Sequence, residues 1–228
     1  MAKTVEDLFF NLVYFFDAII IVFLALLSRK KTINKKFWFF GLYSLINSVI
    51  NYSTKNLDLP QKIDYFLFGF YTIFEYTVFA YLIFLSIQST FFKKLIKIFS
   101  VFFAFFIICY YAFFPVQTID SIPIGIETIL ILIFSFYYFY EQMNDFATST
   151  FIYNKPSFWI IVGMMLYLAG SFFIYIFANK AHNDLLDKYW FLTYLFYILK
   201  SILFFIGILF YAKQSKNLQP AKLRPYLN

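Results

Sequence analysis

Long runs of apolar residues alternate with short polar stretches along the whole chain. A helix needs about 20 mostly apolar residues to cross a bilayer core that is ~30 Å thick. Inside lipid the backbone can satisfy its polar groups only in helices or closed barrels, and these runs are longer than the roughly ten-residue strands of a barrel. The pattern therefore predicts an all-α fold with seven transmembrane helices, at residues 8–27, 37–52, 63–87, 95–114, 122–140, 157–178 and 189–212.

The second predicted span is shorter and more polar than the others. Four of its polar residues lie at positions i, i+3, i+4 and i+7, which places them on one face of a helix. A polar stripe on an otherwise apolar helix should face neighbouring helices rather than lipid. The four residues of this stripe are Ser44, Asn47, Ser48 and Asn51.

Basic residues favour one orientation of the chain in the membrane. Most of the 19 Lys and Arg residues fall in the segments that follow the first, third, fifth and seventh spans. The positive-inside rule places these segments in the cytoplasm. We therefore expect the N-terminus outside, a single transmembrane domain over residues 1–212, and a basic cytoplasmic tail over residues 213–228.

Composition agrees with a membrane protein. Hydrophobic residues make up 62% of the chain and charged residues 14%, whereas a soluble domain is about half apolar and a quarter charged. The net charge is +7, and the basic residues flank apolar spans. This position indicates contact with anionic lipid headgroups rather than nucleic acid. Glu6 and Asp7 stand where a signal peptide would be basic, so the first span is expected to stay in the mature chain.

The most informative residues for function are the ionisable ones inside the predicted spans. Asp17, Glu75 and Lys200 lie near the middle of the first, third and seventh spans, and Glu127 lies about one turn into the fifth. A charge at the bilayer centre costs about 2.5–3.5 kcal/mol. These groups should therefore face the bundle interior, where Lys200 would pair with Asp17, Glu75 or both. The predicted polar intramembrane site comprises Asp17, Asn47, Asn51, Glu75, Glu127, Tyr197 and Lys200.

Two interpretations of this site remain open at the level of sequence. The site is either a polar cavity that binds a small molecule or ion or relays protons, or an ion pair that fixes helix register. No metal site or cofactor is expected, because the single histidine, His182, lies in a polar loop and Cys109 is the single cysteine. No catalytic constellation is visible, so we expect a protein that is not an enzyme.

Two stretches carry a resemblance to known proteins. They are residues 120–143 and residues 153–179, the second followed by YWFLTYLFYILKSILFF. Together they resemble a group of largely uncharacterised seven-helix membrane proteins of Bacteroidota. They are also similar to the membrane input regions of some sensor histidine kinases. The resemblance implies a sensing or accessory module in the inner membrane that acts through a partner.

We therefore expect a receptor-like or accessory sensing module with a polar intramembrane pocket and a cytoplasmic or membrane protein partner. The main alternative is a small-molecule or proton-coupled transporter that uses the intramembrane Asp, Glu and Lys residues. A retinal protein with Lys200 as the attachment site, and a membrane enzyme acting on lipid, are further alternatives. The sequence leaves the oligomeric state open.

Overall fold

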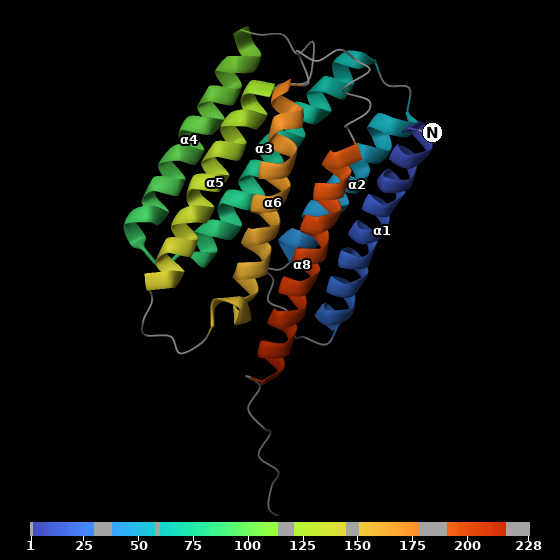
Figure 1. The fold of residues 1–228 in the computed structure, drawn as a ribbon. Helices are drawn as coiled ribbons and strands as arrows, with labels where there is room; N and C mark the ends of the chain where they lie inside the picture. The colour runs from blue at the N-terminus through green and yellow to red at the C-terminus, as the bar shows by residue number, and fades with distance from the viewer. Residues whose placement is uncertain are drawn as a thin grey trace, which may run out of the picture.

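The computed structural model describes residues 2–29, 38–57, 60–113, 121–144, 151–177 and 191–217. This part of the chain forms seven α-helices and one short 3-10 helix, and it contains no strand (Figure 1). The all-α fold is therefore confirmed. In chain order the elements are α1 (Ala2–Arg29), α2 (Trp38–Asn56), α3 (Gln61–Ser86), α4 (Thr90–Phe113), α5 (Ser121–Asn144), η2 (Ile152–Asn154), α6 (Pro156–Phe177) and α8 (Phe191–Asn217).

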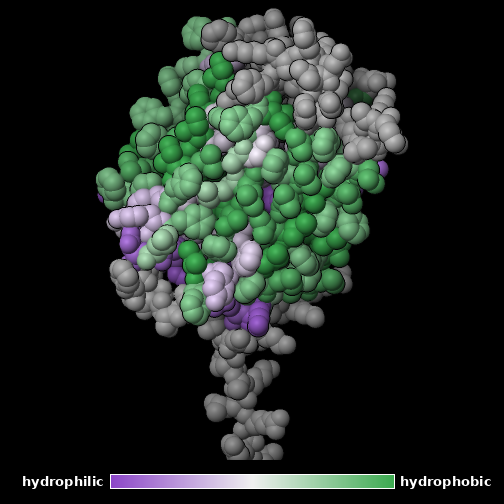
Figure 2. Space-filling model, viewed as in Figure 1, coloured by the Kyte–Doolittle hydropathy of each residue, from purple (hydrophilic) through white to green (hydrophobic). Residues whose placement is uncertain are grey.

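Six of these helices are long and apolar enough to cross a bilayer, namely α1, α3, α4, α5, α6 and α8. The chain is therefore a multi-pass integral membrane protein. Hydrophobic side chains cover most of the described surface in Figure 2, and hydrophilic ones gather toward the lower end, where α5 and α8 finish. The predicted seventh span, at α2, and the orientation of the bundle stay predictions.

Several helices continue past their predicted ends. α1 begins at Ala2 rather than residue 8, and α8 runs to Asn217, so the first residues of the predicted tail are helical. Hydropathy marks the part of a helix that matches the hydrocarbon, whereas backbone hydrogen bonding can continue into the headgroup region. The basic loop at 30–37, His182 and the tail from 218 to 228 lie outside the described residues.

Six helices form a closed ring. Around the ring, α1 packs against α2, α2 against α3, α3 against α5, α5 against α6, α6 against α8, and α8 returns to α1. α4 lies outside this ring, against α3 and α5 (Figure 1). In the α4 span 17% of the residues are buried, compared with 50% in the α3 span, and Phe102 and Phe105 are among its exposed residues. α4 therefore suits a position facing lipid.

The turn between α3 and α4 is fixed by a residue of α5. Glu141 accepts hydrogen bonds from the backbone N–H groups of Gln88 and Ser89, at 2.7 Å each. Ser89 in turn caps the N-terminus of α4, because its Oγ accepts a hydrogen bond from the backbone N–H of Phe92 at 3.3 Å. Three helices are thus joined where α3 and α5 end and α4 begins.

Small residues bring α6 and α8 close together. A Cβ atom added at Gly163 would lie 3.2 Å from the Cβ of Leu203 and 3.3 Å from the backbone oxygen of Lys200. Small residues at such positions allow the backbones of membrane helices to approach each other. Gly163 therefore lets α6 pack directly against the turn of α8 that carries Lys200.

Substitution Gly163→Leu should destabilise the bundle, because the added side chain meets backbone atoms that cannot move without shifting α8. We expect a loss of about 1–3 kcal/mol, the usual effect of overpacking. The free energy of unfolding of the detergent-solubilised protein measures this loss of stability. The control is Ala169→Leu, because Ala169 lies on an exposed position of the same helix. Equal stability of the two variants would contradict the close approach.

Candidate functional site

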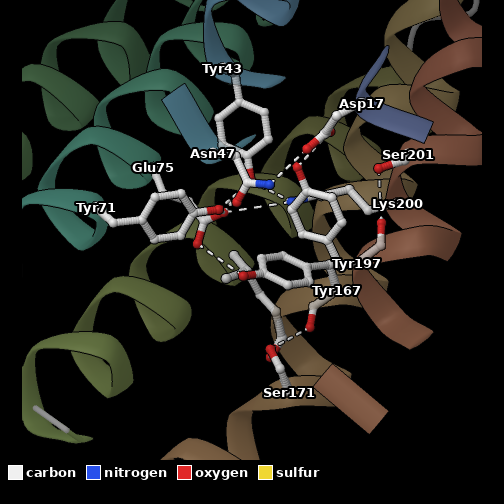
Figure 3. Close-up of polar contacts among 11 residues, drawn as sticks. Asp17, Tyr43, Asn47, Tyr71, Glu75, Tyr167, Ser171, Tyr197, Lys200 and Ser201 are labelled. Carbon is white, nitrogen blue, oxygen red and sulfur yellow. Dashed lines mark hydrogen bonds and ion pairs between the residues drawn. The ribbon is translucent and has the colours of Figure 1, made fainter. Parts of the chain in front are cut away.

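Five of the ring helices send polar side chains to one buried place (Figure 3). Asp17 comes from α1, Tyr43 and Asn47 from α2, Tyr71 and Glu75 from α3, Tyr167 from α6, and Tyr197 and Lys200 from α8. These eight residues are named the polar cluster below. Asp17 and Lys200 have no exposed surface, and Glu75 is buried. The ionisable groups of the cluster are therefore enclosed by the helices.

Lys200 is held by a hydroxyl group, a carboxylate and aromatic rings. Its Nζ donates a hydrogen bond to the Tyr43 hydroxyl and lies 3.7 Å from Oε1 of Glu75. The same atom lies 3.6 Å from the ring centre of Tyr197 and 3.8 Å from that of Tyr167. An ammonium group near ring faces is stabilised by the ring quadrupoles, more strongly when water is excluded. Lys200 therefore has both ionic and aromatic partners.

Glu75 accepts hydrogen bonds from three tyrosines. Tyr43 and Tyr71 donate to its Oε1, the second at 2.8 Å, and Tyr167 donates to its Oε2 at 3.3 Å. The hydroxyl oxygens of Tyr43 and Tyr71 are themselves 2.8 Å apart. Each hydroxyl has one proton, so Tyr43 can donate either to Glu75 or to Tyr71. The same oxygen positions thus fit two arrangements of the protons.

Asp17 has a separate set of donors. Its Oδ2 accepts hydrogen bonds from Nδ2 of Asn47 at 2.8 Å and Oγ of Ser48 at 3.2 Å, and its Oδ1 accepts one from Tyr197 at 2.8 Å. Three hydrogen bonds from neutral donors stabilise a carboxylate that has no direct salt bridge among the described residues. The polar stripe of α2 thus supplies two of these donors.

The structure brings together most of the residues predicted as the polar intramembrane site. Asp17, Asn47, Glu75, Tyr197 and Lys200 all belong to the polar cluster. That these residues bind a ligand or an ion stays a prediction.

Two predicted site residues lie apart from this network. Asn51 is partly exposed, and its backbone carbonyl accepts a hydrogen bond from Thr54. Glu127 is buried on α5, a helix that packs against α3 and α6, and its Oε1 has no hydrogen-bond partner among the described residues. Asn51 therefore does not extend the polar network, whereas Glu127 adds an acid on a neighbouring helix.

Three tyrosines of the cluster were missed in the sequence. Tyr71 lies four residues before Glu75, and Tyr43 lies four residues before Asn47, so each shares a helix face with a predicted site residue. Tyr167 lies four residues after Gly163, on the face of α6 that meets α8. These spacings were usable signals. They were hidden because the chain contains 20 tyrosines, spread over nearly every span.

The arrangement can hold charge and move protons within the membrane. It contains carboxylates, an ammonium group and hydroxyl groups in hydrogen-bonding contact. Across the described ranges, no group of three or more His, Cys, Asp or Glu residues is placed to hold a metal ion.

The fold and this site define a class, namely a multi-pass helical membrane protein with a buried polar cluster joining its helices. Comparison of the chain with known protein families, curated proteins and solved structures finds no match.

Substitution Lys200→Met should be strongly destabilising, because it leaves Glu75 as a buried carboxylate without its cation. Breaking a buried pair in this way costs about 3–5 kcal/mol. The double variant Glu75→Gln/Lys200→Met should lose less stability than the sum of the two single variants, because neither charge is left alone. The free energies of unfolding of all four proteins, measured in one detergent, complete this double-mutant cycle. The control is Lys213→Met, because Lys213 is exposed near the end of α8; a Lys200 variant as stable as this control would contradict the pairing.

Proposed function

We propose that this protein is a receptor-like sensing or accessory module of a bacterial cytoplasmic membrane, with its N-terminus outside and its C-terminus inside. One observation carries the proposal: a single buried cluster joins α1, α2, α3, α6 and α8. A stimulus that changes one contact of the cluster changes the packing of several helices at once. This is the property required of an element that passes information across a membrane.

Lys200 gives the polar cluster two states, one in which it pairs with Glu75 and one in which it pairs with Asp17. Its ammonium group pairs with Glu75 and lies 3.6 Å from the ring centre of Tyr197, whose hydroxyl donates a hydrogen bond to Asp17. In the structure the salt bridge is with Glu75, while Asp17 is held by neutral donors. A ligand or proton that neutralises Glu75 would favour pairing with Asp17 instead. A stimulus can shift such an equilibrium by as much as its binding differs between the two states.

The cytoplasmic ends of the helices are the proposed output. Lys94 and Lys97 are exposed at the start of α4, and Lys213 is exposed near the end of α8. The α3–α4 turn is tied to α5 through Glu141, so a shift of α3 would move this whole end of the bundle. An acidic surface of a protein partner fits these lysines. The resemblance to the input regions of sensor kinases also favours output through a partner.

Neutralising Glu75 should shift the helices at this end of the bundle. Spin labels replace Gln88 and Lys213 in a Cys109→Ala background, because both positions are exposed. We expect the distance between the labels in Glu75→Gln to differ from that in the unaltered cluster by about 1–2 Å, the size of helix shifts in known switches. Pulsed electron paramagnetic resonance in lipid vesicles measures the distance. The control is Thr77→Val, at an exposed position of the same helix. Identical distances in all three proteins would rule out the switch.

A second candidate, a proton-coupled transporter, is favoured by the approach of the Tyr43 and Tyr71 hydroxyls to 2.8 Å beside Glu75. Two proton arrangements on the same oxygens allow a proton to move with little motion of heavy atoms. In this candidate Asp17, Glu75 and Lys200 exchange protons as a substrate passes.

Purified protein in sealed vesicles with an internal pH-sensitive dye tests the transporter. We expect proton entry driven by an imposed pH gradient to exceed that of empty vesicles, and to fall at least tenfold in Glu75→Gln and Lys200→Met, because both variants break the proton-exchanging pair. The control Lys213→Met should retain the flux. Flux that is absent, or unaffected by the two variants, would remove this candidate.

A further inference from the structure

Among the described residues, Glu127 is a buried acid of the ring that does not belong to the polar cluster. It lies in the second turn of α5, is 1% exposed, and its Oε1 has no hydrogen-bond partner in the described part of the chain. Buried polar atoms are usually hydrogen-bonded, because water no longer solvates them. A carboxyl oxygen that is buried and unpartnered in a membrane helix therefore points to a function.

Two other buried acids, Asp17 and Glu75, differ from Glu127 in the hydrogen-bond donors around them. Asp17 and Glu75 each accept hydrogen bonds from three side chains, and Glu75 also pairs with Lys200. Hydrogen bonds from N–H and O–H donors stabilise the ionised form of a carboxyl group. Asp17 and Glu75 are therefore each surrounded by three donors, whereas Oε1 of Glu127 has none in the described part of the chain.

The groups around Glu127 make a third negative charge costly. α5 packs against α3, which carries Glu75 and Tyr76, and Glu75 forms the salt bridge with Lys200 of α8. α6 has no charged residue over its described length, and the lysines of α4 lie in its first two turns, at the opposite end of α5. If Glu127 were ionised, three carboxylates would share one ammonium group. Burying an unpaired charge in this way is unfavourable, and uptake of a proton removes the charge.

We propose that Glu127 is a proton-binding site, and that its carboxyl group is protonated and neutral in the arrangement described here. The ligand of the site is the proton itself. Loss of this proton would place a second carboxylate in competition with Glu75 for Lys200, and so weaken the salt bridge of the polar cluster. This proton site rests on the proposed function in one respect, because both involve the salt bridge between Glu75 and Lys200, and it can be tested separately.

Infrared spectroscopy detects the proton directly, because the carbonyl stretch of a protonated carboxylic acid is separate from the bands of a carboxylate. The full chain is reconstituted in phosphatidylcholine vesicles at neutral pH, with spectra recorded in H₂O and D₂O. We expect a protonated-acid band in the unaltered protein, shifted in D₂O, and its loss in Glu127→Gln. Absence of the band in the unaltered protein, or an unchanged band in Glu127→Gln, would overturn the proposal.

A matched control comes from the same helix. Both oxygens of Glu141 accept hydrogen bonds from backbone N–H groups, so Glu141→Gln should keep the protonated-acid band. Loss of the band in Glu141→Gln alone would overturn the assignment to Glu127.

A conservative variant keeps the test decisive if Glu127→Gln does not fold. In Glu127→Asp the acid remains, and the band should move in frequency without disappearing. A band that does not move would count against Glu127.

The infrared result for Glu127 can be distinguished from the spin-label result that tests the proposed function. A protonated Glu127 with no change in the label distances of Glu75→Gln would keep the proton site and remove the sensing switch. A label shift without the protonated-acid band would keep the switch and remove the proton site.

Discussion

Charge in a membrane interior must find its partners within the protein, and this constraint organises the bundle. One ammonium group, that of Lys200, is buried among three acids, Asp17, Glu75 and Glu127. Lipid offers no hydrogen bonds, so each group is either surrounded by protein donors and acceptors or made neutral. Five helices meet at the cluster to supply those partners, and α5 brings the additional acid. The closed ring is thus also the arrangement that solvates these charges.

The position of α4 follows from the same constraint. This helix contributes no side chain to the polar cluster, lies outside the ring and exposes large aromatic residues. α2 shows the converse. It is not among the helices apolar enough to cross a membrane, yet Ser44 and Asn47 are buried while Leu45 and Val49 are exposed. A moderately polar helix can lie in a membrane when its polar face is turned toward buried partners. Local hydropathy and helix position thus have to be interpreted together.

Much of the fold and part of the site could be predicted from local patterns. The apolar runs located the described helices, with errors at their ends, and the cost of buried charge indicated Asp17, Glu75 and Lys200 as inward-facing. The donors Tyr43, Tyr71 and Tyr167 could not be selected, because tyrosine is common in every part of the chain and its hydroxyl is useful only beside a specific partner. Asn51 shares the stripe of Asn47 but lies a turn further along, where the helix is partly exposed.

The sequence by itself determined that this chain lies in a membrane as a set of helices, and that its intramembrane charges must be shielded from lipid. Both are consequences of side-chain transfer energies along a short stretch of chain. Tertiary structure alone decided that Lys200 pairs with Glu75 while Asp17 is held by Asn47 and Tyr197, and that Oε1 of Glu127 has no hydrogen-bond donor among the described residues. Those choices depend on which helices are neighbours and how they are rotated. Contacts between residues far apart in the chain set these relations, and local hydropathy does not record them.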